Sequence, residues 1–136
     1  MKPSDYQYLE FYQNLGKLFY GIAAIDGKVH EAEFSKLKQL VKQDWLDIDT
    51  SKDDYLSDAA YQIEIVFDWL NDQGECDAKS NFEKFIKFKN KHKQFFTEDI
   101  KKLILKTANA IASSFSGKNK SELMMLAKLD MELKAD

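Results

Sequence analysis

Apolar side chains near the start of this 136-residue chain recur every three or four positions, with a second stripe beside the first. The first stripe consists of Leu9, Tyr12, Leu15, Phe19 and Ile22, and the second of Phe11, Leu18 and Ile25. An α-helix with 3.6 residues per turn places both stripes on one wide apolar face. Because one neighbour cannot cover so wide a face, this segment predicts a helix that lies between others in a bundle.

The same spacing continues along the chain and predicts five further helices. Their apolar positions run over 34–45, 59–70, 82–96, 100–111 and 123–133. Ser80 with Glu83 predicts the capping box of the fourth helix, and Thr97 precedes two acids that suit the start of the fifth. One proline and five glycines leave few helix breakers, and no segment has the period of two typical of strands. We therefore expect an all-α bundle of six or seven helices, forming a single domain over residues 1–136.

Asp26 and Gly27 form an acidic glycine turn between the first two predicted helices, and Glu31 and Glu33 follow it. Gly27 suits a left-handed turn, so it is a candidate structural turn residue. Glu33 stands six residues after the glycine, as in the second half of an EF-hand loop. The first ligand positions of that loop hold apolar residues here, which excludes a full EF-hand. Two interpretations remain: a purely structural turn, or a weak site for calcium or magnesium formed by Asp26, Glu31, Glu33 and backbone carbonyls.

This turn returns in weaker form near the end of the chain. An Ile-Ala pair, a Gly-Lys turn and an early Glu recur over 111–122, with Gly117 as the turn glycine and Ser116 in place of the acid. The similarity predicts a weak internal helix-turn-helix repeat. It also raises an alternative function, a metal-dependent enzyme with an acidic site between the two turns, where Asp26, Glu33 and Glu122 would converge.

The segment at 22–29, Ile-Ala-Ala-Ile-Asp-Gly-Lys-Val, together with Glu33, resembles the signature turn of TerB-like domains, the tellurite-resistance TerB family. The amino-terminal domain of DjlA-type co-chaperones is similar. The resemblance covers residues 12–45 best, and Ser116 departs from the Asp-Gly of the family's later turn. It implies an all-helical domain with helix pairs around acidic turns. It also implies a role in stress responses, in complexes with a TerC-type membrane protein and TerD-type calcium-binding proteins.

Lysines dominate the fourth predicted helix and its end. They are Lys84, Lys87, Lys89, Lys91 and Lys93, and phenylalanines lie between them. Lysines between apolar residues are typical of the solvated side of a buried helix. They also form a candidate partner surface, centred on Lys84, Lys87 and Lys91, which would attract an acidic protein. A helical RNA-binding module is the alternative, although the net charge of −3 disfavours a dedicated nucleic-acid binder.

No local motif in the sequence demands catalysis. The chain has no Gly-rich phosphate loop, and the single Cys76 lies between acids that would raise the pKa of its thiol. One cysteine fits a reducing compartment, and no stretch approaches the ~20 apolar residues of a membrane span. We therefore expect a non-enzymatic, cytoplasmic protein-interaction module of a stress-related system.

Met124 and Met125 begin the last apolar segment. Methionines at helical spacing are usually core filler, so we expect both to be buried. Were they exposed, they would indicate a groove for a partner.

Overall fold

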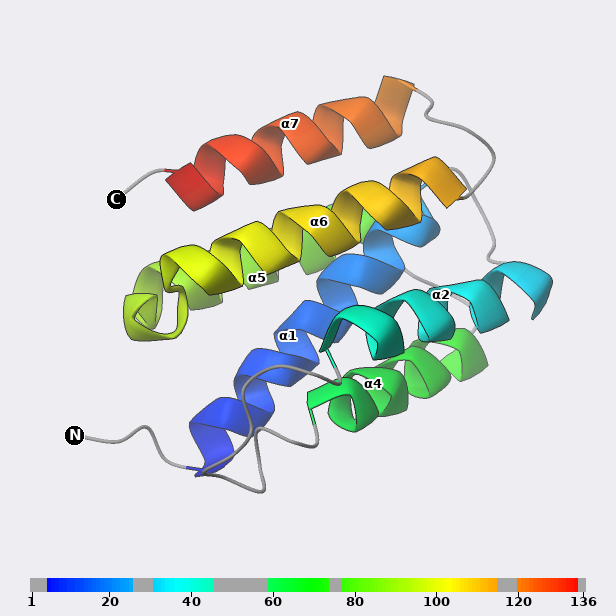
Figure 1. Ribbon diagram of the computed structural model, residues 1–136, viewed down its shortest axis with the longest axis horizontal. Coiled ribbons are helices and arrows are strands. Elements are labelled where there is room, and N and C mark those ends of the chain that lie inside the picture. Colours follow the sequence, from blue (N-terminus) through cyan, green and yellow to red (C-terminus); the bar gives the residue numbers. More distant parts are fainter. Residues whose placement is uncertain (1–4, 26–30, 46–58, 74–76, 115–119, 135–136) are drawn as a thin grey trace.

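The computed structural model describes residues 5–25, 31–45, 59–73, 77–114 and 120–134. In this part of the chain there are six α-helices, a short 3₁₀ turn and no strand (Figure 1). They are α1 (Asp5–Ala23), α2 (Glu31–Trp45), α4 (Ala59–Gln73), α5 (Ala78–Lys91), η1 (Lys93–Phe95), α6 (Glu98–Ser114) and α7 (Lys120–Lys134). The prediction of an all-α helical bundle is confirmed. None of the described helices combines the length and apolar character needed to cross a bilayer.

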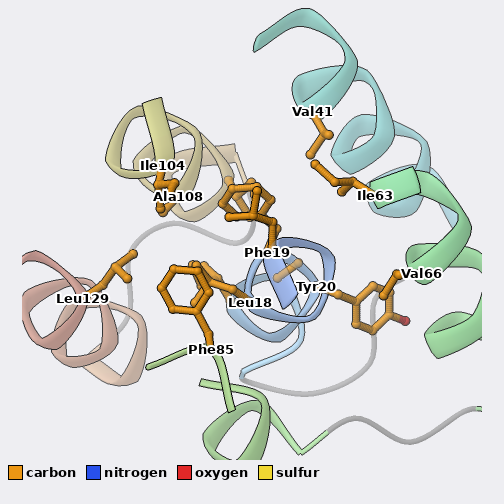
Figure 2. Packing of buried hydrophobic residues seen from close by; sticks show 14 of the residues in the cluster. Leu18, Phe19, Tyr20, Val41, Ile63, Val66, Phe85, Ile104, Ala108 and Leu129 are labelled. Atoms are coloured by element: carbon orange, nitrogen blue, oxygen red, sulfur yellow. The ribbon is translucent and has the colours of Figure 1, made fainter. Parts of the chain in front are cut away.

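The helix α1 lies at the centre of the bundle, as its two apolar stripes predict. It packs against α4, α5 and α6, and Figure 1 shows it running between them. Its Leu18 and Phe19 point into a shared core with Phe85 of α5 and Leu129 of α7 (Figure 2). Leu9, in the second turn of α1, is an exception to the predicted stripe and remains 36% exposed.

Two glycines of α1 let other helices approach closely. A β-carbon built on Gly16 would lie 2.9 Å from the Cβ of Val66 on α4, and one on Gly21 would lie 3.4 Å from the Cα of Ala78 on α5. A β-carbon at the first position would overlap its neighbour, whereas the second distance is an ordinary van der Waals contact. Gly16 is therefore required by the packing of α1 on α4.

The capping prediction is wrong for α5 and confirmed for α6. The N-cap of α5 is Asp77, whose Oδ1 accepts a hydrogen bond from the backbone N–H of Ser80 at 3.1 Å. Ser80 and Glu83 lie inside the helix. The side chain of Asp77 satisfies a backbone N–H of the first turn that has no partner within the helix, so the N-cap of α5 lies three residues before the predicted one. At the start of α6, the Thr97 hydroxyl oxygen accepts a hydrogen bond from the N–H of Ile100 at 3.3 Å.

The fourth predicted helix is also too long at its other end. α5 ends at Lys91, and Phe95 lies in η1, which turns the chain toward α6. The ring of Phe95 stacks on that of Phe11 of α1, with 5.1 Å between centroids. The phenylalanine that seemed to extend the helix therefore closes one end of the core instead.

The helix α7 packs on α6, and a buried lysine joins it to α5. Lys89 is only 2% exposed, and its ammonium group donates a hydrogen bond to the backbone carbonyl of Glu132 in the last turn of α7. A carbonyl at that position has no partner within its own helix and attracts a cation. Lys89 therefore caps α7, unlike the other lysines of α5.

The two adjacent methionines of α7 have different environments. Met125 is 8% exposed, as predicted, but Met124 is 53% exposed and Leu123 is 49% exposed. The buried face of α7 consists of Met125, Leu126, Leu129 and Leu133. Helix geometry turns Leu123 and Met124 away from that face, so the prediction that both lie in the core is wrong.

Candidate functional site

A groove of about 750 Å³ lies between α1 and α5. The two helices are antiparallel, because Gly21 near the end of α1 lies by Ala78 at the start of α5, whereas Phe11 stacks on Phe88. From α1 the groove receives Glu10, Gln13, Asn14 and Lys17, and from α5 and its end it receives Lys84, Lys87, Phe88, Asn90, Lys91 and His92.

All three predicted partner-surface lysines line this groove. Lys84, Lys87 and Lys91 are exposed and follow one another at spacings of three and four residues, so they share one face of α5. The core face of the same helix holds Phe85 and Phe88. The amphipathic pattern of α5 therefore places these three lysines side by side along the groove.

Lys17 adds a fourth cation from the opposite wall, and the sequence analysis missed it. It is the only charged residue between 11 and 25, and this isolation in a neutral, largely apolar run is the signal that marks it. Its pKa lies below the ordinary value of 10.5, because partial burial disfavours the charged form and the charge of Lys84 repels it. Glu10 acts in the opposite direction and raises the pKa.

The lysines of the groove outnumber the acids in its described lining. Among the described residues, none of these ammonium groups forms an ion pair within 4.0 Å, and Glu10 is the one carboxylate in the described lining. Four cations against one anion form a locally positive surface on a chain whose net charge is −3. Such a surface attracts anionic groups by charge.

Amide and aromatic side chains complete the described lining. Gln13, Asn14 and Asn90 bring amide groups into the groove, and the ring of Phe88 lies 4.5 Å, centroid to centroid, from that of His92. Amides donate and accept hydrogen bonds, as a peptide backbone requires. The lysines of the groove can attract an anion, and its amides can hydrogen-bond to it.

The predicted cation site falls mostly outside the described residues. Asp26, Gly27 and Gly117 are not among them, and the structure does not describe the side chain of Glu33. Glu31 begins α2 and is exposed. Within the described ranges no cluster of three or more His, Cys, Asp or Glu could hold a metal ion. The weak calcium or magnesium site remains a prediction, as does the second turn of the internal repeat.

Comparison with protein-family models, curated proteins and solved structures found no match to this chain. The resemblance to TerB-like domains therefore rests on residues 22–33 and the helical pattern around them. It remains a prediction from the sequence.

Proposed function

We propose that this protein is a helical interaction module that binds an acidic segment of a partner protein in the α1–α5 groove. The observation that carries the proposal is the convergence of Lys17, Lys84, Lys87 and Lys91 on one groove without ion pairing in the described part of the chain. An acidic segment would relieve the repulsion between Lys17 and Lys84.

A protein segment fits the lining better than a nucleic acid does. The neutral amides Gln13, Asn14 and Asn90 offer partners for a peptide backbone. Of the two aromatic rings in the described lining, Phe88 is 5% exposed and His92 is half-buried, so the groove offers little ring surface on which several bases could stack. The negative net charge of the chain also opposes long-range attraction of RNA.

The TerB-like resemblance supplies a biological setting for this proposal. It supports a non-enzymatic, cytoplasmic role in a stress-related system, with protein partners that include a membrane-protein complex. Weak binding of calcium or magnesium at Asp26, Glu31 and Glu33 belongs to the same proposal.

The alternative of a metal-dependent enzyme requires Glu122 to join this acidic site. Calorimetric titration with each cation tests the metal, since a site of this kind gives a heat of binding that is lost in the Asp26→Ala Glu33→Ala variant.

The groove is tested with a fluorescein-labelled peptide of alternating Glu and Ser, measured by fluorescence anisotropy. We expect Lys84→Glu Lys87→Glu to weaken binding by roughly tenfold or more, since each reversal turns an attraction of order 1 kcal/mol into repulsion. The matched control is Lys36→Glu Lys102→Glu, which reverses two exposed lysines on α2 and α6 away from the groove.

Three outcomes of this experiment would contradict the proposal. One is that the wild-type protein fails to bind the acidic peptide. Another is an equal loss of affinity in the groove variant and the control variant. The third is binding of single-stranded oligo(U) in place of the peptide, with affinity rising as salt falls, which would establish the RNA-binding alternative instead.

A further inference from the structure

A second hollow lies between α5 and α7, away from the basic groove. α7 packs on α6 and leaves a space of about 210 Å³ toward α5. Its apolar wall consists of Ile25, which follows α1, Phe82 of α5, and Met124 and Met125 of α7. A water molecule occupies about 30 Å³ in the liquid, so this hollow has room for a whole apolar side chain.

An exposed apolar side chain lines this hollow although the core does not need it there. Met124, in its wall, is 53% exposed, whereas the buried face of α7 already holds Met125, Leu126 and Leu129. Covering an exposed side chain of this size removes apolar surface from water and therefore favours binding. Methionine adapts its shape to different partners. The mouth of the hollow is therefore suited to binding an apolar side chain of another molecule.

The rim of the hollow is cationic. Lys79 of α5 and Lys128 of α7 line it, both are exposed, and within the described residues neither forms an ion pair. A second copy of this chain docking through the same face would bring the same lysines against them, and like charges oppose such a pairing. A partner with an apolar anchor would fit the apolar interior, and acidic residues around that anchor would complement the lysines of the rim.

We propose that this α5–α7 pocket receives the apolar anchor of a partner protein, carried on an amphipathic helix with acidic flanking residues. A helix crossing α7 at the pocket would insert a leucine or phenylalanine between Phe82 and Met125 and place carboxylates near Lys79 and Lys128. The pocket does not depend on the α1–α5 groove, because α5 contributes Lys79 and Phe82 here and a different set of residues there.

Methyl NMR on the full chain tests this proposal directly. The sequence has four methionines, and three of them, Met124, Met125 and Met131, lie on α7. The probe is a synthetic amphipathic helical peptide with leucine anchors flanked by glutamates, added to protein labelled with ¹³C at the methionine methyl groups. We expect the Met124 and Met125 signals to shift with peptide concentration and the Met131 signal to shift less. No shift of Met124 or Met125 at about 1 mM peptide, a concentration that detects even weak complexes, overturns the proposal.

Matched substitutions on α7 separate the pocket from general surface effects. Met124→Glu places a negative charge at the mouth, and we expect it to weaken peptide binding by about tenfold or more. Met131→Glu makes the same change at a residue that is 70% exposed and does not line the pocket, so affinity should stay within about twofold of wild type. Equal losses in the two variants would contradict the proposal.

Two further comparisons identify the class of ligand that the pocket binds. A peptide with alanine in place of the leucine anchors should bind much more weakly, and equal affinity would mean that charge alone attracts it. Vesicles of phosphatidylglycerol should leave the Met124 signal unchanged. A response to vesicles without a response to the peptide would make this a lipid-binding face. The Lys84→Glu Lys87→Glu variant should bind the anchored peptide at the Met124 and Met125 methyls as wild type does, so failure of the groove and failure of this pocket are distinguishable.

Discussion

Lys17 shows how a neighbouring helix changes the chemistry of one side chain. It lies on α1, and Lys84 of α5 faces it across the basic groove. Partial burial and the charge of Lys84 lower its pKa, and Glu10 only partly opposes them. An anion bound in the groove would stabilise the charged form of Lys17 and raise its pKa again. Binding of an acidic ligand is therefore linked to proton uptake at alkaline pH.

We predict that the affinity of the groove for the acidic peptide falls as pH rises through the lowered pKa of Lys17, beginning below 10.5. Lys17 also affects stability, in the opposite direction. Between its lowered pKa and 10.5 the unfolded chain binds more protons at Lys17 than the folded chain, so the free energy of unfolding rises with pH. Deprotonation of Lys17 therefore does not unfold the protein, and unfolding does not explain the loss of affinity. Anisotropy titrations from about pH 7 to about pH 10 measure the effect.

The control for this prediction is Lys17→Arg, which stays charged throughout that range. Its affinity should decline less than that of the wild-type protein as pH rises. Parallel curves for the two proteins would mean that Lys17 does not control the pH dependence.

At the scale of elements, α1 has two glycines with different roles. Gly16 faces α4, where a β-carbon would approach Val66 to 2.9 Å, and Gly21 faces α5, where the nearest atom of Ala78 is at 3.4 Å. The Cβ of Val66 is bonded directly to its Cα, so it cannot move without the backbone of α4, and β-branching leaves its Cγ atoms little freedom to rotate away. The contact at Ala78 needs no such movement. The same substitution should therefore have opposite effects at the two sites.

We predict that Gly16→Ala lowers the free energy of unfolding by up to about 2 kcal/mol, because overpacking exceeds the gain in helix propensity. Gly21→Ala should be neutral or should raise it by up to about 1 kcal/mol, since alanine favours the helix and meets only an ordinary contact. Urea unfolding of both variants, monitored by circular dichroism, measures the difference. Similar destabilisation by both would show that packing against α5 is as tight as packing against α4.

At the scale of the whole molecule, α5 lies between two surfaces of different character. Among the described residues, the groove toward α1 has four lysines and neutral amides, whereas the hollow toward α7 has an apolar wall and two lysines at its rim. Acidic residues lie on other helices, away from the groove. One of them is Asp68 of α4, whose carboxylate pairs with Lys38 of α2 at 2.6 Å. Positive charge is therefore concentrated on the groove of a chain that is acidic overall.

This distribution predicts different responses of the two surfaces to salt. Binding of the Glu-Ser peptide to the groove should weaken steeply between low salt and about 0.5 M salt, because screening shortens the range of charge interactions to a few ångström. Binding of the leucine-anchored peptide to the α5–α7 pocket should weaken less, since burial of its anchor does not depend on charge. Anisotropy at several salt concentrations measures both. Equal salt dependence would indicate that the leucine anchor contributes little.

The sequence by itself determined the helices and the central position of α1, because apolar spacing and the width of an apolar face are local properties of the chain. It also identified Lys84, Lys87 and Lys91, since helical spacing alone places them on one face. It predicted Ser80 as the cap of α5, where the structure has Asp77, because both residue types cap helices and their spacing does not distinguish them.

Only the tertiary structure decided which helix faces meet. The antiparallel packing of α1 on α5 brought Lys17 to the lysines of α5, sixty-seven or more positions later in the chain. The packing of α7 on α6 decided that Met125 is buried while the adjacent Met124 is exposed at a pocket. Both features are surfaces made by two helices, and the periodicity of one helix does not specify which neighbour it will pack against.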